Sequence, residues 1–226
     1  NRDYRRLNLD ADNVHVDFQG MPTDVEVEFV LATKAPNGAC FKGITRTLNA
    51  LSYDGADGDA QVTAIKNGND VFQGNWPGNK YLNFFICGEI GGAAGYTTLP
   101  GGWSANQMTN GIWVLHDYVG SIGTSSVGTS RTLTHEVGHW LNLRHIWGDT
   151  TCGSDLVADT PSHNTANYGV PTYPHYSTCT GTPVEMTMNY MDYTDDRGMY
   201  MFSIGQKARI DAIFLSGGPR FSFAQP

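Results

Sequence analysis

Residues 135–145 read His-Glu-Val-Gly-His-Trp-Leu-Asn-Leu-Arg-His, and this stretch decides the fold class. In a helix with 3.6 residues per turn, His135 and His139 lie one above the other on one face, so both imidazoles can reach a single zinc ion. Glu136 lies one step around the helix, where its carboxylate can accept a proton from a water molecule at the metal. The spacing therefore predicts a metal-binding helix on which the glutamate is a base and not a ligand.

A third zinc ligand must come from beyond this helix. A catalytic zinc ion usually takes three protein ligands and leaves one position for water, and His145 can supply the third. A continuous helix would carry His145 about 9 Å along the axis and onto another face, so the chain must turn sharply. Asn142 lies where that turn belongs, and asparagine tolerates a left-handed conformation. The alternative is a gluzincin-type site with Glu185, the only glutamate after Glu136, as the third ligand.

Length, composition and charge exclude several classes of protein. A chain of 226 residues, 40% of them hydrophobic, is large enough for one domain or two lobes and is not typical of disorder. Its longest apolar runs fall far short of a bilayer span. The net charge is −8, without a basic stripe. We therefore expect neither a membrane span nor a nucleic-acid partner.

The cysteine count indicates disulfides. Cys40, Cys87, Cys152 and Cys179 form no C-x-x-C motif. Two disulfides in an oxidising compartment are the economical interpretation, and free core thiols are the alternative. The simplest pairing joins Cys40 to Cys87 and Cys152 to Cys179, although four cysteines allow three pairings. The second bridge would close residues 148–183, which follow neither a helical nor a strand period, into one large loop.

Hydrophobic periodicity elsewhere predicts an α+β chain folded in two lobes around a cleft. The expected elements are strands over residues 25–31, 81–87 and 111–119 and helices over residues 131–142 and 203–215. Ser130 is a candidate N-cap for the first helix, and Ser203 with Gln206 reads as a capping box for the second. Four further histidines lack partners at ligand spacing and are expected to be surface or packing residues: His15, His116, His163 and His175.

The sequence also resembles the metzincin metallopeptidases, in which a Met-turn follows the long zinc motif. Residues 188–193, Met-Asn-Tyr-Met-Asp-Tyr, match that turn. Within this clan the chain resembles the pappalysin family, particularly its secreted bacterial members. Besides the zinc motif, the matching segments are V-E-F-V-L-A-T, G-I-T-R-T, Y-L-N-F-F-I-C-G, G-Y-T-T-L-P-G, V-A-D-T-P and N-Y-M-D-Y-T-D-D, and they span about residues 25–210.

The resemblance implies a metzincin-like catalytic domain over residues 1–226. Its upper subdomain, residues 1–142, is expected to hold a mixed twisted sheet and the active-site helix above the cleft. Its irregular lower subdomain, residues 143–226, is expected to end in a helix. The glycine-rich residues 91–102 would form part of the upper rim, where an extended substrate can add as a strand. The family usually begins with a further strand and helix, so this chain is expected to be a trimmed form.

The resemblance also implies roles for individual residues. Glu136 is expected to polarise the attacking water, and Met191 to lie beneath the metal. Tyr193 is expected to donate a hydrogen bond to the developing oxyanion. The zinc ligands are expected to be His135, His139 and His145. A structural calcium site is expected at Asp155, Val157, Asp159 and Thr160, because hard oxygen ligands suit that ion.

Three departures from the family pattern affect the site. Asn142 replaces a common glycine. Val170 and Gly198 stand where many relatives have a cysteine pair, so the loop near the specificity pocket is expected to be looser. Arg197 stands where relatives that prefer basic side chains have an acidic residue.

Together these features predict a secreted zinc endopeptidase, stabilised by calcium, that acts as a monomer on proteins or peptides. The alternative is a catalytically impaired, zinc-containing peptide-binding protein.

Overall fold

The computed structural model describes residues 1–224 and has α+β content, as the sequence predicts. In chain order, its main elements are α1 (Gly58–Gly68), β1 (Phe84–Cys87), β2 (Gly95–Tyr96), β3 (Ile112–Leu115), α2 (Thr132–Trp140) and α3 (Ile204–Phe214). Short 3-10 turns lie at Val16–Phe18, Ala50–Ser52, His116–Tyr118, Val127–Thr129, Asp196–Gly198 and Phe221–Ala224. Among residues 1–224, no helix is long and apolar enough to cross a membrane.

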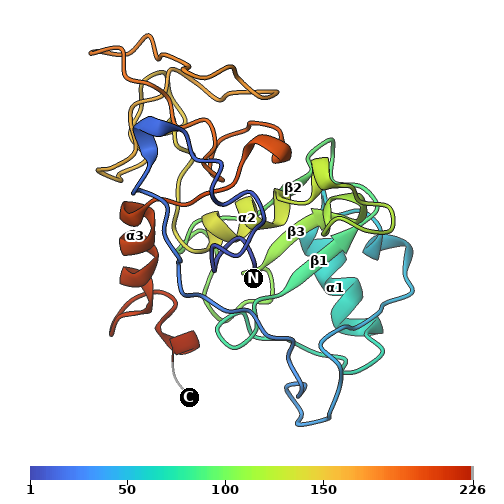
Figure 1. Ribbon diagram of the computed structural model, residues 1–226. Helices are drawn as coiled ribbons and strands as arrows, with labels where there is room; N and C mark the ends of the chain where they lie inside the picture. The colour runs from blue at the N-terminus through green and yellow to red at the C-terminus, as the bar shows by residue number, and fades with distance from the viewer. Residues whose placement is uncertain (225–226) are drawn as a thin grey trace.

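The sheet is small and mixed, with strand order β1-β3-β2. Strand β3 pairs in parallel with β1 and antiparallel with β2. Adjacent residues of β3 face opposite sides, as strand geometry requires. Ile112 packs in the core cluster that contains residues of α2, whereas Trp113 packs in the cluster that contains residues of α1. The two helices therefore cover opposite faces of the sheet (Figure 1).

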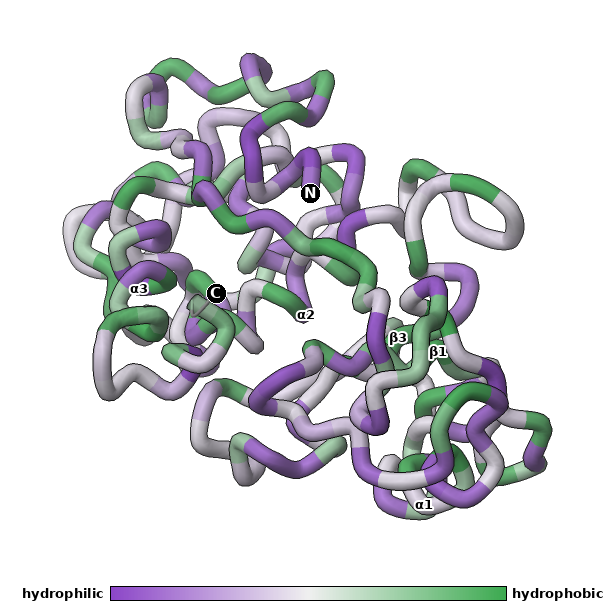
Figure 2. The backbone as a smooth tube through the Cα atoms, turned by 90° about the horizontal axis from the view of Figure 1, so that it is seen from below, coloured by the Kyte–Doolittle hydropathy of each residue, from purple (hydrophilic) through white to green (hydrophobic). Residues whose placement is uncertain are grey.

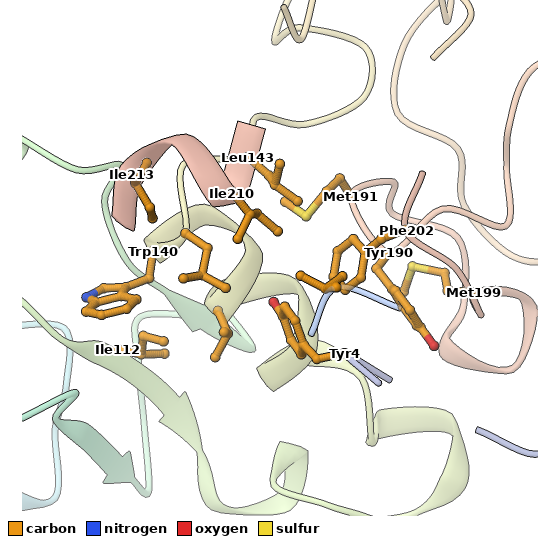
Figure 3. Packing of buried hydrophobic residues seen from close by; sticks show 13 residues of the cluster. Tyr4, Ile112, Trp140, Leu143, Tyr190, Met191, Met199, Phe202, Ile210 and Ile213 are labelled. Atoms are coloured by element: carbon orange, nitrogen blue, oxygen red, sulfur yellow. The ribbon is translucent and has the colours of Figure 1, made fainter. Parts of the chain in front are cut away.

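Helix α2 occupies the middle of the molecule. It lies between the sheet and the C-terminal helix α3 in both views of the chain (Figures 1 and 2). Val137 and Trp140 of α2 belong to the same buried cluster as Met191 and Ile210 from the C-terminal part. Figure 3 shows this packing, with Met191 beside Leu143. Because apolar burial from both sides holds α2, the residues along it have fixed positions.

The elements closest to the site confirm most of the sequence-based expectations. Strands β1 and β3 lie within the predicted ranges, although both are shorter. The capping box of α3 is present: the Ser203 hydroxyl accepts from the Gln206 amide at 3.1 Å, and the Gln206 side chain accepts from the Ser203 amide at 2.9 Å. The predicted N-cap of α2 is wrong. Arg131 occupies that position, and the Ser130 hydroxyl instead donates to the Val127 carbonyl.

The predicted strand over residues 25–31 is also wrong. Its alternation is real, since Val25, Val27 and Phe29 pack against the core cluster around α2. However, two of its backbone amides bond to the N-terminal residues, with the Val25 amide donating to the Tyr4 carbonyl and the Phe29 amide to the Asn1 side chain. Glu26 has a φ of 63°, which interrupts an extended backbone, and the segment joins no β-ladder. Alternating hydrophobicity predicts which side chains are buried, but a β-strand also needs a neighbouring strand to pair with.

One of the two predicted disulfides is present. Cys152 and Cys179 are bonded, with their Cα atoms 5.6 Å apart, and the chain between them has neither helix nor regular strand. The pairing of Cys40 with Cys87 is wrong. Cys87 is buried at the end of β1, where its sulfur accepts a hydrogen bond from Gln61 at 3.1 Å, whereas Cys40 is exposed. The free core thiol considered as an alternative therefore applies to Cys87.

Replacing both Cys152 and Cys179 by alanine is expected to lower the free energy of unfolding by about 3.5 kcal/mol, because the bridge restricts a long irregular loop in the unfolded chain. Chemical denaturation measures this difference. The matched control is Cys40→Ala, which removes an exposed thiol outside any bridge and is expected to leave stability unchanged. Equal stability of the double variant and the wild type would contradict the prediction.

Candidate metal centre and active site

The end of helix α2 brings the third histidine back to the first two. His135 and His139 lie one turn apart on α2. Just after the helix, Asn142 has a φ of 78°, the left-handed conformation that the sequence predicts. Arg209 of α3 donates to the Asn142 carbonyl at 2.6 Å and holds this turn in place. The turn reverses the chain, so that His145 reaches the same point as His135 and His139.

The three imidazoles converge through their Nε2 atoms. The Nε2 atom of His139 is 3.0 Å from that of His135 and 3.1 Å from that of His145. The three histidines are a group that could hold one metal ion, since their ligand atoms all lie within 4.8 Å of one another. We call these residues the histidine cluster.

Each ring is oriented by a partner at its other nitrogen. Nδ1 of His135 donates to the Tyr190 carbonyl at 2.7 Å, and Nδ1 of His139 donates to the Leu143 carbonyl at 2.8 Å. Nδ1 of His145 contacts a carboxylate oxygen of Asp149, a partner that the sequence reasoning missed. A proton on Nδ1 leaves the Nε2 lone pair free to face a metal.

The electrostatics of the histidine cluster fit zinc. Burial holds the pKa of His135 well below its usual value, and His139 and His145 lower it further. Burial, with a smaller contribution from His145, lowers the pKa of His139 to about 4. Both rings are therefore neutral at neutral pH, which is the form that binds metal. Three neutral imidazoles are a known donor set for catalytic zinc.

Glu136 lies next to the cluster, between α2 and the edge of the sheet. Its side chain is almost fully buried, and a Cβ atom on Gly95 of β2 would come within 3.1 Å of Glu136 Cγ. Burial raises the pKa of Glu136 to about 8. A positive metal ion at the histidine cluster would lower this pKa, because an opposite charge favours the carboxylate.

The predicted Met-turn packs directly beneath α2. Met191 is fully buried, and a Cβ atom on Gly138 would lie 2.5 Å from the Met191 sulfur. Glycine at position 138 therefore allows the turn to approach the helix closely. The Met191 carbonyl accepts from the Ile146 amide at 3.0 Å, which ties the turn to the segment that carries His145.

Tyr193 follows the Met-turn and lies beside the cluster. Its ring centroid is 4.9 Å from that of His145 and 5.5 Å from that of His135. Trp147 packs against it at 4.8 Å. The side chain is nevertheless 42% exposed, so it can contact a bound molecule. Burial raises the pKa of the phenol, with a contribution from Glu136, so the phenol keeps its proton at neutral pH.

The residues expected at a calcium site are only partly brought together. The Thr160 hydroxyl lies 2.9 Å from both carboxylate oxygens of Asp155 and 3.0 Å from the Val157 carbonyl. Asp159 is directed elsewhere: its carboxylate accepts from the Ser203 hydroxyl and the Gly205 amide at the start of α3. Three of the four residues therefore share one oxygen-rich turn, and the fourth stabilises a helix terminus.

The structure does not support Glu185 as a zinc ligand. Its carboxylate is buried and accepts from the Asn164 amide at 2.6 Å and from the Asn167 side chain at 2.7 Å. The histidine cluster already contains a third imidazole.

The positions that depart from the family pattern lie close to one another. A Cβ atom on Gly198 would be 3.2 Å from both γ-carbons of Val170, so these residues are neighbours without a bridge. Arg197 is exposed and forms an ion pair with Asp195 at 3.5 Å.

Comparisons with known proteins agree with this geometry. Residues 66–214 match the peptidase family M43, described as pregnancy-associated plasma protein-A. An extracellular metalloprotease of Verticillium alfalfae is 31% identical over 194 residues, which cover 82% of this chain and 66% of that protein. An extracellular metalloprotease of Colletotrichum graminicola is 32% identical over 189 residues, which cover 80% of this chain and 63% of that protein. The chain thus spans less than two thirds of the length of either relative.

A solved structure extends the likeness to the fold. Mature mirolysin of Tannerella forsythia, in complex with a cleaved peptide, superposes with a TM-score of 0.87 at 36% identity. The match covers 98% of this chain and 83% of that one. With two thirds of the sequence matching the family and nearly all of it sharing this fold, the chain belongs to the pappalysin family of metzincin metallopeptidases.

Proposed function

We propose that this chain is a zinc-dependent endopeptidase that hydrolyses peptide bonds of protein substrates. The observation that carries the proposal is the convergence of three imidazole nitrogens beside a buried glutamate. The names of the fungal relatives, extracellular metalloproteases, support the same activity. The zinc ligands in this proposal are His135, His139 and His145, as the sequence predicts.

Zinc at this position supplies Lewis-acid chemistry: it polarises a carbonyl oxygen and lowers the pKa of a water molecule. The protein contributes the proton transfers. Glu136 takes a proton from the attacking water and delivers it to the leaving amine. Burial raises the pKa of Glu136 and a positive ion at the histidine cluster would lower it again, so the same carboxyl group can both accept and release that proton.

Tyr193 is proposed to stabilise the developing negative charge on the substrate carbonyl oxygen. Its phenol is protonated at neutral pH and partly exposed beside the cluster, so it can donate a hydrogen bond to that oxygen. Strand β2 is the edge of the sheet next to Glu136, where an extended substrate can pair with the backbone. Met191 is proposed to support the histidine cluster from below.

We also propose that the protein is secreted and acts as a monomer, with residues 1–226 as one catalytic domain. The Cys152–Cys179 bridge supports an oxidising compartment, and so do the extracellular relatives.

A structural calcium ion is proposed at Asp155, Val157 and Thr160, whose oxygens face one another. Adding calcium to the zinc-loaded protein is expected to raise the Tm of the wild type, because a ligand that binds only the folded state stabilises it. Asp155→Asn is expected to abolish that rise. Asp159→Asn is the control: it weakens the start of α3 and lowers the Tm, but it should keep the calcium-dependent rise. A rise that persists in Asp155→Asn would contradict this site.

Casein cleavage tests the proposed activity. The zinc-loaded protein is expected to degrade casein, to lose this activity with a chelator and to recover it when zinc is restored. A protein that binds peptides without cleaving them, the alternative considered from the sequence, would retain zinc and bind casein but release no fragments. That result would contradict the proposal.

A further inference from the structure

Residues 167–169, which we call the flanking segment, run alongside the residues that follow the Met-turn. The Asn167 amide donates to the Asp192 carboxylate at 2.9 Å, and the Asp195 amide donates to the Gly169 carbonyl at 2.7 Å. Between these two bonds, the ring centroid of Tyr168 lies 6.0 Å from that of Tyr193. The flanking segment thus holds the chain on both sides of Tyr193.

The side chain of Asn167 joins two buried carboxylates. Its Nδ2 atom donates to Asp192 Oδ2 at 2.9 Å and to Glu185 Oε2 at 2.7 Å. Asn167, Glu185 and Asp192 are 8%, 2% and 0% exposed. Carboxyl oxygens that are shielded from water need hydrogen-bond donors. The two protons of the Asn167 amide supply one donor to each.

Two neighbouring histidines lie farther from these carboxylates than the Asn167 amide does, and His175 Nε2 is 3.7 Å from Glu185. Nε2 of His163 accepts from the Met186 amide at 2.9 Å, which places the proton of a neutral ring on Nδ1. That nitrogen lies 3.5 Å from Asp192 and 3.7 Å from Glu185, beyond a good hydrogen bond to either. The Asn167 side chain therefore supplies the donors that lie within hydrogen-bond distance of both carboxylates.

The link continues from Asp192 to Tyr193. Asp192 Oδ1 accepts from the Tyr193 amide at 2.8 Å and from the Asn167 amide. Each carboxylate oxygen of Asp192 therefore has a defined partner, and the carboxylate cannot rotate without breaking the bond to the Tyr193 backbone. The histidine cluster is held by other contacts, including the Tyr190 and Leu143 carbonyls.

We propose that Asn167 is a positioning residue, which acts through Asp192 to fix the Tyr193 phenol relative to the histidine cluster. This rests on the proposed function, in which Tyr193 stabilises the transition state. Without the amide, Asp192 Oδ2 and Glu185 Oε2 each lose a buried donor and Asp192 leaves its place, so Tyr193 moves while the proposed zinc ligands stay. A misplacement of about 1 Å at such a group costs on the order of 100-fold in rate.

A double-mutant cycle on the zinc-loaded protein tests the coupling. Asn167→Ala is expected to lower kcat by about 10- to 100-fold with little change in KM. In the Tyr193→Phe background, the same substitution is expected to lower kcat by no more than about 2-fold further, because coupled residues are not additive. Full additivity of the two losses would overturn the proposal.

The matched control removes another buried amide. Gln61 of α1 donates to the Ser52 carbonyl at 2.9 Å and accepts from the Trp113 indole at 2.6 Å. Gln61→Ala is expected to lower stability, but its effect on kcat should be the same with and without Tyr193→Phe. If Gln61→Ala shows the same coupling as Asn167→Ala, general destabilisation explains the result and the proposal fails.

Fluorine NMR of protein labelled with 3-fluorotyrosine provides a readout that is independent of activity. The resonance missing in Tyr193→Phe identifies Tyr193. Asn167→Ala is expected to shift or broaden that resonance, whereas Gln61→Ala leaves it in place, and zinc content stays unchanged in both. An unmoved resonance in Asn167→Ala would overturn the proposal. If the wild type cleaves no peptide, the proposed function fails, and the resonance alone still decides whether Asn167 positions Tyr193.

Asp192→Asn breaks the same link from its other end if Asn167→Ala does not fold. Its amide oxygen can keep the two backbone donors at Oδ1, but its amide nitrogen then faces the donor nitrogen of Asn167. The same shift of the Tyr193 resonance and the same non-additivity with Tyr193→Phe are expected, and their absence would overturn the proposal.

Discussion

Glu136→Gln is expected to lower kcat for peptide hydrolysis by between about 100-fold and 10,000-fold, the usual contribution of a general base. The amide has the shape of the carboxyl group and fits the same buried place, but it cannot accept a proton. Because Glu136 is not one of the three proposed metal ligands, zinc content is expected to stay at the wild-type level. Steady-state kinetics on a fluorogenic peptide, with zinc analysis of the same samples, measure both quantities.

Glu28→Gln is the matched control for this prediction. It makes the same chemical change on an exposed glutamate outside the site and is expected to leave kcat unchanged. If Glu136→Gln turned over as fast as the wild type with zinc bound, the proton transfer would have to come from another group and the proposed mechanism would be wrong.

His145→Ala is expected to have the second large effect, the loss of bound zinc together with activity. Two imidazoles on α2 cannot complete a three-ligand site, and structural and catalytic zinc sites depend on the full donor set. Zinc content after dialysis against a weak chelator measures the loss.

Glu185→Gln distinguishes the two candidate third ligands. In the structure, Glu185 bonds to the Asn164 amide and the Asn167 side chain, so its substitution is expected to leave zinc bound. Retention of zinc by His145→Ala, together with its loss from Glu185→Gln, would reverse the assignment and favour a gluzincin-type site.

The site could be predicted from sequence because its geometry is local. His135 and His139 share a helix face by the helical period alone, and Asn142 signals the turn that returns His145. The partners that orient these rings were harder to find. Asp149 is only four residues from His145, but no sequence motif marks this contact. The Tyr190 carbonyl is 55 residues from His135 in the sequence.

Elements of the fold whose structure depends on tertiary contacts were harder to predict from the sequence. Helix α1 escaped prediction because its buried face is short and includes Gln61 and Ala64 beside Val62. Its start was detectable in retrospect, since Asp57 caps the Ala60 amide. Strand β2 has only two residues, and its pairing with β3 depends on a partner that a single sequence does not reveal.

The prediction of a bridge between Cys40 and Cys87 was wrong because it also depends on tertiary contacts. The even count of four cysteines favoured two bridges. The position of Cys87 within β1, where Gln61 satisfies its sulfur, is a property of the packed core and not of the spacing between cysteines. The bridge between Cys152 and Cys179 was predictable because an irregular loop of that length needs a restraint.

X-ray absorption at the zinc edge of the freshly purified protein tests the central claim most directly. The account predicts three imidazole nitrogens at about 2.0–2.1 Å from the metal. In His145→Ala, the spectrum of any zinc that stays bound should show one imidazole ligand fewer. A spectrum without zinc, or one dominated by sulfur or carboxylate ligands, would contradict a metal centre built from His135, His139 and His145.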